Sequence, residues 1–281
     1  MSLLNIIPRI RIHVWGGLGS QLFGIALKNE LKMTLPWRKS ILVCHSSGVT
    51  KRLPEIDKFS VETLPINDFE SDLRKSNLIR SWTTRSIRYL LLKLGIVADS
   101  NCQHEYRSIR PWVLSIRGHY TKLKFSQSTI KLLYENFNAI DNKQNKSEDN
   151  TLNVHYRLGD LLSLNEKNPV EIDILIFKIK SVIQEKNIKT ILVYSDSIDY
   201  AVEHLSRRLP QAKVLGKKVD SHQTISDCIR AENFIGTNSK ISLWIGIMRN
   251  NNVLNKVSYL PNSMKDLLEA QLGQDHIVDY Y

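Results

Sequence analysis

Residues 190–208, TILVYSDSIDYAVEHLSRR, predict a buried β-strand that leads at once into an amphipathic α-helix. Residues 190–194 form a short apolar run, and residues 198–208 repeat apolar side chains at helical spacing. The same order recurs on both sides, with strands expected at 152–158, 212–215 and 234–236 and helices at 171–186, 223–231 and 240–249. Such alternation indicates a parallel sheet with helices on both faces.

The first half of the chain shows a looser version of this pattern. We expect strands at residues 9–15 and 41–45, helices at 20–33, 86–94 and 127–137, and irregular chain at 50–80. Residues 138–150, NAIDNKQNKSEDN, are polar and predict a linker. The sequence therefore predicts an α/β protein with two Rossmann-like domains, residues 1–145 and 146–281, whose parallel sheets face a central cleft.

Positive charge is concentrated in the first half. The 281 residues include 39 Lys and Arg and 28 Asp and Glu, a net charge of +11. Residues 1–150 hold 23 basic and 13 acidic residues, whereas residues 151–281 hold 16 and 15. A basic half favours an anionic partner, namely phospholipid, a lipid-linked pyrophosphate acceptor or nucleic acid. A solvated basic surface is the alternative.

The cysteines and the apolar runs indicate the cellular compartment in which the protein is expected. Cys44, Cys102 and Cys228 are too few and too far apart for a disulfide framework or a zinc site, which suits a reducing cytosol. No apolar run reaches the roughly 20 residues of a membrane span, and no secretory signal is expected. Residues 74–94 combine six basic side chains with Trp82, Tyr89 and leucines. We expect a cytoplasmic protein, attached peripherally to the inner face of the cytoplasmic membrane; an ordinary core-facing helix is the alternative.

A glycine-rich turn, Gly16-Gly17-Leu18-Gly19-Ser20-Gln21, follows the first predicted strand. Glycines let the backbone approach a ligand closely, and the start of a helix offers N–H groups to an anion. Gly17, Gly19 and Gln21 are therefore candidate ligand-binding residues. Leu22 stands where a dinucleotide fingerprint requires glycine, and no phosphate-binding Gly-Lys-Ser/Thr follows. A merely tight turn is the alternative.

The second motif is HYRLGD at residues 155–160. His155 and Arg157 share one face of the strand and lie at its carboxyl end, where open parallel sheets bind ligands. The guanidinium of Arg157 suits two phosphate oxygens at once, and Asp160 can orient it. A plain ion pair between Arg157 and Asp160 is the alternative.

Two further strand ends fall on the same predicted edge. FIGTNSKISLW at residues 234–244 opens a helix, where Asn238 or Ser239 would cap it and Ser239 and Ser242 would bind phosphate. YSDS at residues 194–197 adds Ser195 and Asp196. Capping alone would also explain the Asn238-Ser239 pair.

In order, GGLGSQLFGIA, HYRLGD, YSDS and FIGTNSKISLW resemble motifs of the α-1,2-fucosyltransferase family, glycosyltransferase family 11, over residues 12–247. The resemblance implies an inverting GT-B enzyme that moves L-fucose from GDP-fucose to a hydroxyl of a glycan, as in the synthesis of O-antigen and other surface polysaccharides. It implies no metal or other cofactor, acceptor binding by residues 1–145, and donor binding by residues 146–281. The expected partners are the nucleotide sugar and an oligosaccharide or lipid-linked glycan acceptor, and no nucleic acid.

The resemblance also assigns roles to single residues. Arg157 and Ser239 correspond to contacts with the donor pyrophosphate. Thr224 stands where relatives carry an aspartate that reads guanine, and Asp227 lies one helical turn further on the same face. The chain departs from the family at Ser20, usually asparagine, and at Ser197, usually aspartate.

The candidate catalytic residues are Arg157, His155 and Glu166. Arg157 would stabilise the charge on the leaving phosphate, and Glu166, the nearest acid after HYRLGD, is a candidate general base, with His13 as another. Three other functions stay open: transfer of a different nucleotide-activated sugar, a non-enzymatic nucleotide- or nucleic-acid-binding protein, and an inactive sugar-binding scaffold.

Overall fold

The computed structural model divides the chain into two compact units, unit 1 over Met1–Thr129 and unit 2 over Ile130–Tyr281. It describes residues 8–45, 55–56, 59, 61–64, 86–87, 89–100, 109–140, 150–158, 172–250, 256–272 and 277–281, with the side chains of 138–140 excepted. The division lies earlier than the expected linker, because residues 130–140 belong with unit 2. The domain boundary predicted at residues 145 and 146 lies outside the described residues.

Unit 1 contains a parallel sheet with strand order β3-β2-β1-β5-β4. Its strands are β1 (Ile10–Trp15), β2 (Ser40–His45), β3 (Thr63–Leu64), β4 (Val97–Asp99) and β5 (Ser115–Arg117). Helix α1 (Leu18–Thr34) joins β1 to β2 and packs on both strands. Helix α4 (Gln127–Ile140) begins at the end of unit 1.

Two buried charged side chains hold the loops of unit 1. Glu30 on α1 is fully buried, and its Oε1 accepts hydrogen bonds from the N–H and the hydroxyl of Ser126 at 2.6 and 2.7 Å. The guanidinium of Arg38 donates to the carbonyls of Pro8, Pro111 and Val113. Because buried polar groups are costly unless paired, these bonds fix the chain on either side of the strands.

Unit 2 contains a parallel six-stranded sheet with strand order β11-β10-β9-β6-β7-β8. The strands are β6 (Thr151–His155), β7 (Thr190–Tyr194), β8 (Lys213–Gly216), β9 (Asn233–Gly236), β10 (Ser258–Leu260) and β11 (Val278–Tyr280). The helices are α6 (Ile172–Lys186), α7 (Ile198–Arg208), α8 (Ser221–Arg230), α9 (Lys240–Asn250), the 3₁₀ turn η4 (Asn262–Met264) and α10 (Lys265–Leu272).

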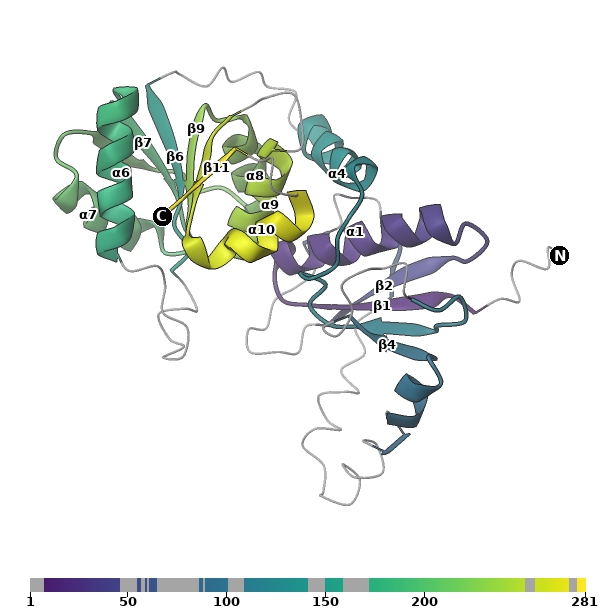
Figure 1. Cartoon of the computed structure of the whole chain (residues 1–281). Coiled ribbons are helices and arrows are strands. Elements are labelled where there is room, and N and C mark those ends of the chain that lie inside the picture. Colours follow the sequence, from purple (N-terminus) through teal and green to yellow (C-terminus); the bar gives the residue numbers. More distant parts are fainter. Residues whose placement is uncertain are drawn as a thin grey trace. The chain divides into compact units, whose positions relative to one another are not determined.

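The order of the strands places the helices of unit 2 on both faces of its sheet. The chain runs outward from β6 through α6 and α7, returns through α8 to β9, and then runs outward on the other side. Right-handed crossovers then put α6 and α7 on one face and α8, α9 and α10 on the other (Figure 1). The parallel α/β class predicted from the sequence is confirmed.

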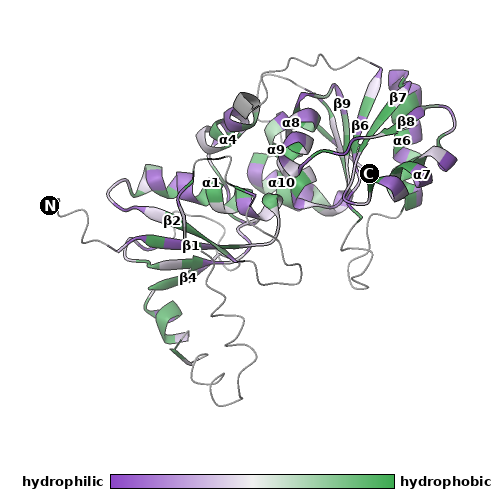
Figure 2. Cartoon of the chain, turned by 180° about the vertical axis from the view of Figure 1, so that it is seen from behind, coloured by the Kyte–Doolittle hydropathy of each residue, from purple (hydrophilic) through white to green (hydrophobic). Residues whose placement is uncertain are grey.

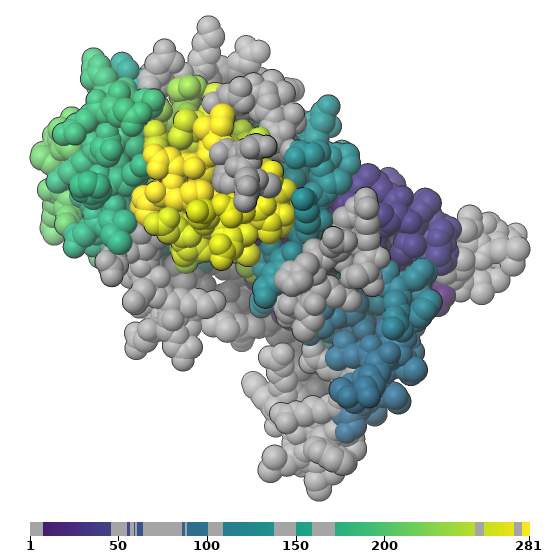
Figure 3. Space-filling model, viewed as in Figure 1, coloured from purple at the N-terminus to yellow at the C-terminus, as the bar shows by residue number. Residues whose placement is uncertain are grey.

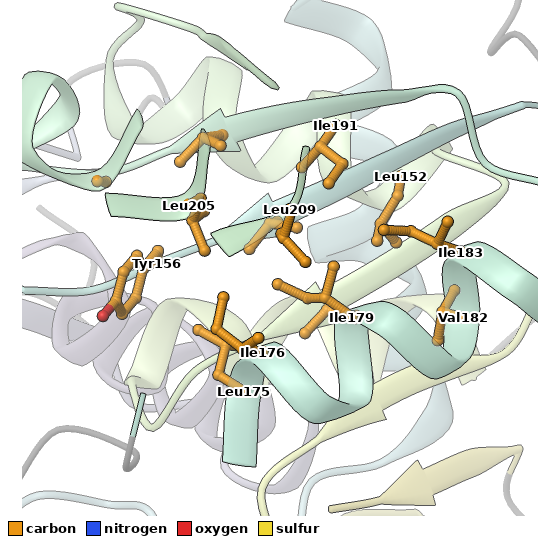
Figure 4. Close-up of a cluster of buried hydrophobic side chains, with 14 of the residues drawn as sticks. Leu152, Tyr156, Leu175, Ile176, Ile179, Val182, Ile183, Ile191, Leu205 and Leu209 are labelled. Atoms are coloured by element: carbon orange, nitrogen blue, oxygen red, sulfur yellow. The ribbon is translucent and has the colours of Figure 1, made fainter. Parts of the chain in front are cut away.

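In Figure 2 the central strands of unit 2 consist largely of hydrophobic residues, in green, whereas the helices carry both hydrophobic and hydrophilic residues, in green and purple. In space-filling view, the C-terminal residues, in yellow, form part of the surface of unit 2 (Figure 3). The core on the α6 and α7 face brings together side chains of both helices and of β6 and β7 (Figure 4), among them Leu152, Leu175, Ile179, Ile191 and Leu205. Burying each such side chain contributes about 1.5–3 kcal/mol, so this core holds the central strands in register. Among the described residues, no helix is long and apolar enough to cross a membrane.

Candidate functional site

The carboxyl ends of β6 and β9 meet at the point where the strand order of unit 2 reverses. β7 and β8 lie on one side of β6, while β9, β10 and β11 lie on the other. His155, the last residue of β6, is in register with Gly236 of β9 and with Tyr194 of β7. In open parallel sheets this reversal leaves a crevice at the carboxyl ends of the strands, which is where ligands bind. The strand ends at His155, Tyr194 and Gly236 therefore gather at one edge.

Arg157 lies just beyond β6 and forms an ion pair with Asp196, which follows β7. The other carboxylate oxygen of Asp196, Oδ1, accepts a hydrogen bond from the N–H of Leu158 at 3.1 Å. The Arg157 side chain is 17% exposed, so the pair is sheltered and the guanidinium can still reach a ligand. Asp196 thus orients Arg157, the role that the sequence analysis offered to Asp160.

Thr237 joins the end of β9 to the end of β6. Its hydroxyl accepts a hydrogen bond from the N–H of Arg157 at 2.9 Å and donates to the carbonyl of His155 at 3.1 Å. The N–H of Thr237 also donates to that carbonyl. Thr237 is buried, so these bonds hold the backbone of Arg157 from the side opposite Asp196.

His155 faces the start of α9 rather than solvent. Its Nδ1 lies 2.7 Å from the hydroxyl of Ser242 and 3.4 Å from that of Ser239. The Ser239 hydroxyl also accepts a hydrogen bond from the N–H of Ser242 at 3.0 Å, so Ser239 caps α9. Ser242 is fully buried and Ser239 is half-buried. Of the two serines predicted to bind phosphate, Ser239 therefore lies nearer the surface.

The charge state of His155 follows from its surroundings. Burial, and then the positive charge of Arg157, lower the pKa of His155 to about 4, against the opposing effect of Asp196. His155 is therefore neutral at pH 7. A neutral imidazole held by Ser242 suits positioning of the edge better than proton donation to a substrate.

The residues predicted to read the base lie on α8, behind β6 and β7. Asp227 accepts hydrogen bonds from the Tyr194 hydroxyl at 3.1 Å and from Gln223 Nε2 at 2.7 Å. The Thr224 hydroxyl donates to the carbonyl of Asp220 at 2.9 Å. Asp227 is half-buried, while Thr224 is buried. Of the two, Asp227 has the more accessible side chain.

Arg249 of α9 supports this arrangement from within the core. It is fully buried, and its guanidinium donates to the carbonyls of Cys228, Ile229 and Ala231 at the carboxyl end of α8. Its Nε donates to the Ser258 hydroxyl at 3.0 Å. The guanidinium of Arg249 thus caps the carboxyl end of α8 and links α8 to β10.

The predicted glycine turn lies in unit 1. Gly16 adopts a φ of +83°, and Gly17 caps α1 in an extended conformation. Gln21 is buried; its Nε2 donates to the carbonyl of Gly16 and its Oε1 accepts from the N–H of Glu55. The amide of Gln21 therefore holds the turn and the chain near Glu55. Gly19 is buried in the first turn of α1.

Two histidines and a tryptophan stack at the carboxyl ends of β1 and β2. His13 Nδ1 lies 2.8 Å from His45 Nε2, and the rings of Trp15 and His45 are 4.6 Å apart. Burial, and then Arg117, His45 and Arg11, lower the pKa of His13 to about 3, so it is neutral at pH 7 and a weak base.

The remaining predicted residues divide into two groups. Asn238 is exposed before α9, and Ser195 lies beside Asp196, where its hydroxyl accepts from the N–H of Ser197 at 3.1 Å. Asp160 and Glu166 lie outside the described residues. Within the described ranges, no group of three or more His, Cys, Asp and Glu is placed to hold a metal ion.

Sequence reasoning missed Thr237 and Tyr194 as parts of this edge, and Arg249 as the buried side chain that caps α8 at the amino ends of β9 and β10. A threonine directly after the Gly236 strand end was the available signal for Thr237. A charged residue in the otherwise apolar run of α9 was the signal for Arg249.

The fold has known counterparts. The chain is similar to the E. coli heptosyltransferase WaaC with ADP, at 11% identity and a TM-score of 0.51, over 97% of this chain and 93% of that one. It is also similar to POFUT1 in complex with GDP-fucose, at 11% identity and a TM-score of 0.41, over 98% of both chains. A glycosyl transferase family 9 structure from Veillonella parvula gives 10% identity and a TM-score of 0.49, over 98% and 87%. Comparison of the sequence with family models and with curated proteins finds no match.

The likeness to the heptosyltransferase establishes the fold. The chain has the GT-B fold of glycosyltransferases, with an arginine-centred edge at the strand reversal of its second unit. The predicted GT-B fold is confirmed. The central cleft and membership of the α-1,2-fucosyltransferase family stay predictions.

Proposed function

We propose that the protein is an inverting glycosyltransferase that binds the pyrophosphate of a nucleotide sugar at Arg157. The observation that carries the proposal is the position of Arg157, held by Asp196 and Thr237 at the strand reversal of a GT-B unit. The N-terminal end of α9 opens at the same edge and adds a positive helix dipole. Two independent sources of positive potential thus meet where a ligand of this fold binds.

The proposed reaction places negative charge on the leaving phosphate. The bond between the sugar C1 and the β-phosphate oxygen breaks, and the acceptor hydroxyl oxygen bonds to C1 as its proton passes to a general base. The guanidinium of Arg157 stabilises the charge left on the nucleoside diphosphate, and this proposal needs no metal for that step. Glu166 and His13 are the proposed general bases, and burial with nearby positive charge lowers the pKa of His13 to about 3, which makes it a weak base.

The finer proposal is transfer of L-fucose from GDP-fucose to a glycan hydroxyl with α-1,2 linkage. Its support is the resemblance of the four motifs over residues 12–247 to α-1,2-fucosyltransferases. In this proposal α8 reads the base through Asp227, which Tyr194 and Gln223 hold in place. The glycan acceptor, either free oligosaccharide or lipid-linked, binds to unit 1.

An adenine nucleotide sugar is a second class of donor to consider, because the heptosyltransferase that shares this fold was solved with ADP. Thr224 stands where the resembling family has its base-reading aspartate, which weakens the sequence argument for guanine. Transfer of another nucleotide-activated sugar is therefore the alternative function.

Calorimetry with GDP, ADP, UDP and TDP, followed by a hydrolysis screen of the matching nucleotide sugars, tests the proposal. We expect GDP to bind most tightly and GDP-fucose to release GDP. Asp227→Asn should weaken GDP binding on the order of tenfold, since a hydrogen bond to a charged group contributes about 1.5–3 kcal/mol. Asp220→Asn, which keeps the cap of α8, is the matched control. Tighter binding of ADP or UDP would replace the fucosyl proposal, and no nucleotide binding would overturn both.

A further inference from the structure

The short helix that leads into β4 carries a row of exposed apolar side chains. Ile87, Tyr89, Leu90 and Leu94 are 58%, 61%, 56% and 51% exposed, and Trp112, which follows in the loop before β5, is 55% exposed. None of the described residues from 86 to 94 is buried. Contiguous exposed apolar surface of this kind marks an interaction site. These five residues are called the apolar patch below.

Local signals specify the end of this helix. The N–H of Ile96 donates to the carbonyl of Leu91, and the N–H of Gly95 donates to that of Leu92. With Gly95 at a φ of +70°, these two bonds form a Schellman cap. The helix therefore ends in a defined way at Gly95, and Leu90 and Leu94 are exposed at its end.

The patch is continuous across the helix and the loop before β5. Trp112 Nε1 donates to the carbonyl of Leu94 at 3.1 Å, which joins the two segments. Arg110 lies 5.5 Å over the ring of Trp112, and Lys93 lies 4.9 Å over the ring of Tyr89. Figure 2 shows this helix largely in green, and Figure 3 shows the blue residues leading into β4 on the surface in view.

The two described cations at the patch, Lys93 and Arg110, lie over its tyrosine and tryptophan rings, and the sequence around them is basic. Residues 74–98 contain six Lys or Arg and no Asp or Glu, and Arg110 adds a further cation across the loop. The surface of an ordinary protein partner carries charges of both signs, so the site that binds it normally carries both signs as well. An anionic bilayer carries only negative charge, so it favours a uniformly basic site. Tyrosine and tryptophan, each with an apolar ring and a polar group, suit the boundary between lipid headgroups and acyl chains.

We propose that the apolar patch and its flanking cations dock unit 1 on an anionic lipid bilayer. The apolar side chains enter the headgroup boundary, and Lys93 and Arg110 contact lipid phosphates. Because tyrosine and tryptophan rings hold these two cations in place, the charges lie at the rim of the patch. The proposal concerns a surface of unit 1 alone and is independent of the donor site in unit 2.

Sedimentation of the full chain with phosphatidylcholine vesicles, with and without phosphatidylglycerol, tests the docking. We expect binding to vesicles that contain phosphatidylglycerol, with affinity falling as salt rises. Lys93→Gln with Arg110→Gln should lower the partition coefficient about 30-fold, the factor that corresponds to about 1 kcal/mol for each basic residue. Leu90→Gln with Trp112→Gln should abolish binding while circular dichroism shows that the chain stays folded.

Matched controls exist in unit 2. Phe177 on α6 is 75% exposed and Lys213 on β8 is exposed, so Phe177→Gln and Lys213→Gln change the same chemistry outside the patch. Both should bind vesicles as the wild type does. The proposal is overturned if the wild type ignores anionic vesicles, or if patch and control variants bind equally. Self-association of the wild type, abolished by Leu90→Gln with Trp112→Gln while no variant binds vesicles, would instead assign the patch to a second copy of the chain.

Discussion

Asp196 holds Arg157 at the carboxyl edge of unit 2 by pairing with its guanidinium through one oxygen while the other accepts from the N–H of Leu158. The carboxylate follows β7 and the arginine follows β6, so the pair spans two adjacent strands. Residues far apart in sequence are therefore fixed relative to each other by the register of the sheet. A ligand anion at this edge would meet a cation whose direction is already set.

The Asp196→Asn variant tests whether the negative charge of Asp196 is needed to orient the guanidinium of Arg157. The amide oxygen can still accept from Leu158, but the ion pair with Arg157 is lost. We expect turnover to fall on the order of tenfold, because a charge-assisted contact contributes about 1.5–3 kcal/mol. Nucleoside diphosphate affinity should stay level or rise, because a negative charge near the phosphates is gone. Steady-state kinetics and calorimetry together give both quantities.

Asp199→Asn is the control for that experiment. Asp199 also pairs with a lysine, Lys218, at 3.4 Å, but its side chain is 89% exposed. Surface pairs contribute little, so this variant should match the wild type in both assays. Equal losses in the two variants would show that Asp196 has no special role.

Thr237→Val tests the bond between the loops after β6 and β9. Valine keeps the shape of the threonine side chain but has no hydroxyl. The N–H of Arg157 therefore loses its acceptor, and the carbonyl of His155 loses one donor. We expect the free energy of unfolding to fall by about 1–3 kcal/mol and activity to fall with it. Thr129 is equally buried, and its hydroxyl makes no hydrogen bond in the described structure, so Thr129→Val should be nearly neutral. Urea unfolding of both variants measures the difference, and equal midpoints would refute the bridging role.

The low pKa of His155 predicts a loss of stability in mild acid. The unfolded chain takes up a proton near pH 6.5, whereas the folded chain resists it until about pH 4. More protons are bound by the unfolded state between these values, so stability falls as pH falls through this window and is full above it. His155→Gln should flatten the pH dependence of the unfolding free energy by up to about 3 kcal/mol across the window. His13 contributes similarly and should leave a residual slope.

His119→Gln is the control for the pH experiment, because His119 is exposed. Its unfolding free energy should follow the wild-type curve from pH 7 to pH 4. A His155→Gln variant that also follows the wild-type curve would mean that His155 does not resist protonation in the folded state.

The sequence predicted some elements residue for residue and missed others. Strand β7 and helix α7 lie where expected, because an apolar run with polar flanks precedes a clear helical period. The strands β3, β4, β5, β10 and β11 were not predicted, and each has only two or three residues. Strands this short are stabilised by pairing with neighbours, which local sequence does not encode. Helix α10 was also missed. It has only eight residues, and a helix this short is stabilised by tertiary packing rather than by its own sequence.

The candidate site was predictable as an edge but not as a set of contacts. Because strand ends of a parallel sheet share one side, His155, Asp196 and Ser239 were expected together. The pairing of Asp196 with Arg157 depends on the register of β6 with β7. The bond of Thr237 depends on the register of β6 with β9. Such pairings arise from tertiary structure, so the motif alone could not give them.

The central claim is that Arg157 carries the charge-stabilising role. Arg157→Ala should lower the release of nucleoside diphosphate from the preferred nucleotide sugar at least a hundredfold, about 3 kcal/mol, as for loss of a preorganised donor. Arg157→Lys should also lose most activity, because lysine keeps the charge but not the planar fork. Arg207→Ala removes an exposed arginine of α7 that pairs with Glu203, and should leave activity unchanged. EDTA should leave the wild-type rate unchanged.

The most direct single measurement is the turnover of Arg157→Ala beside its circular dichroism spectrum and unfolding midpoint. We expect a folded variant that still unfolds cooperatively and has a rate at least a hundredfold lower. A folded Arg157→Ala variant that releases nucleoside diphosphate at nearly the wild-type rate would contradict it.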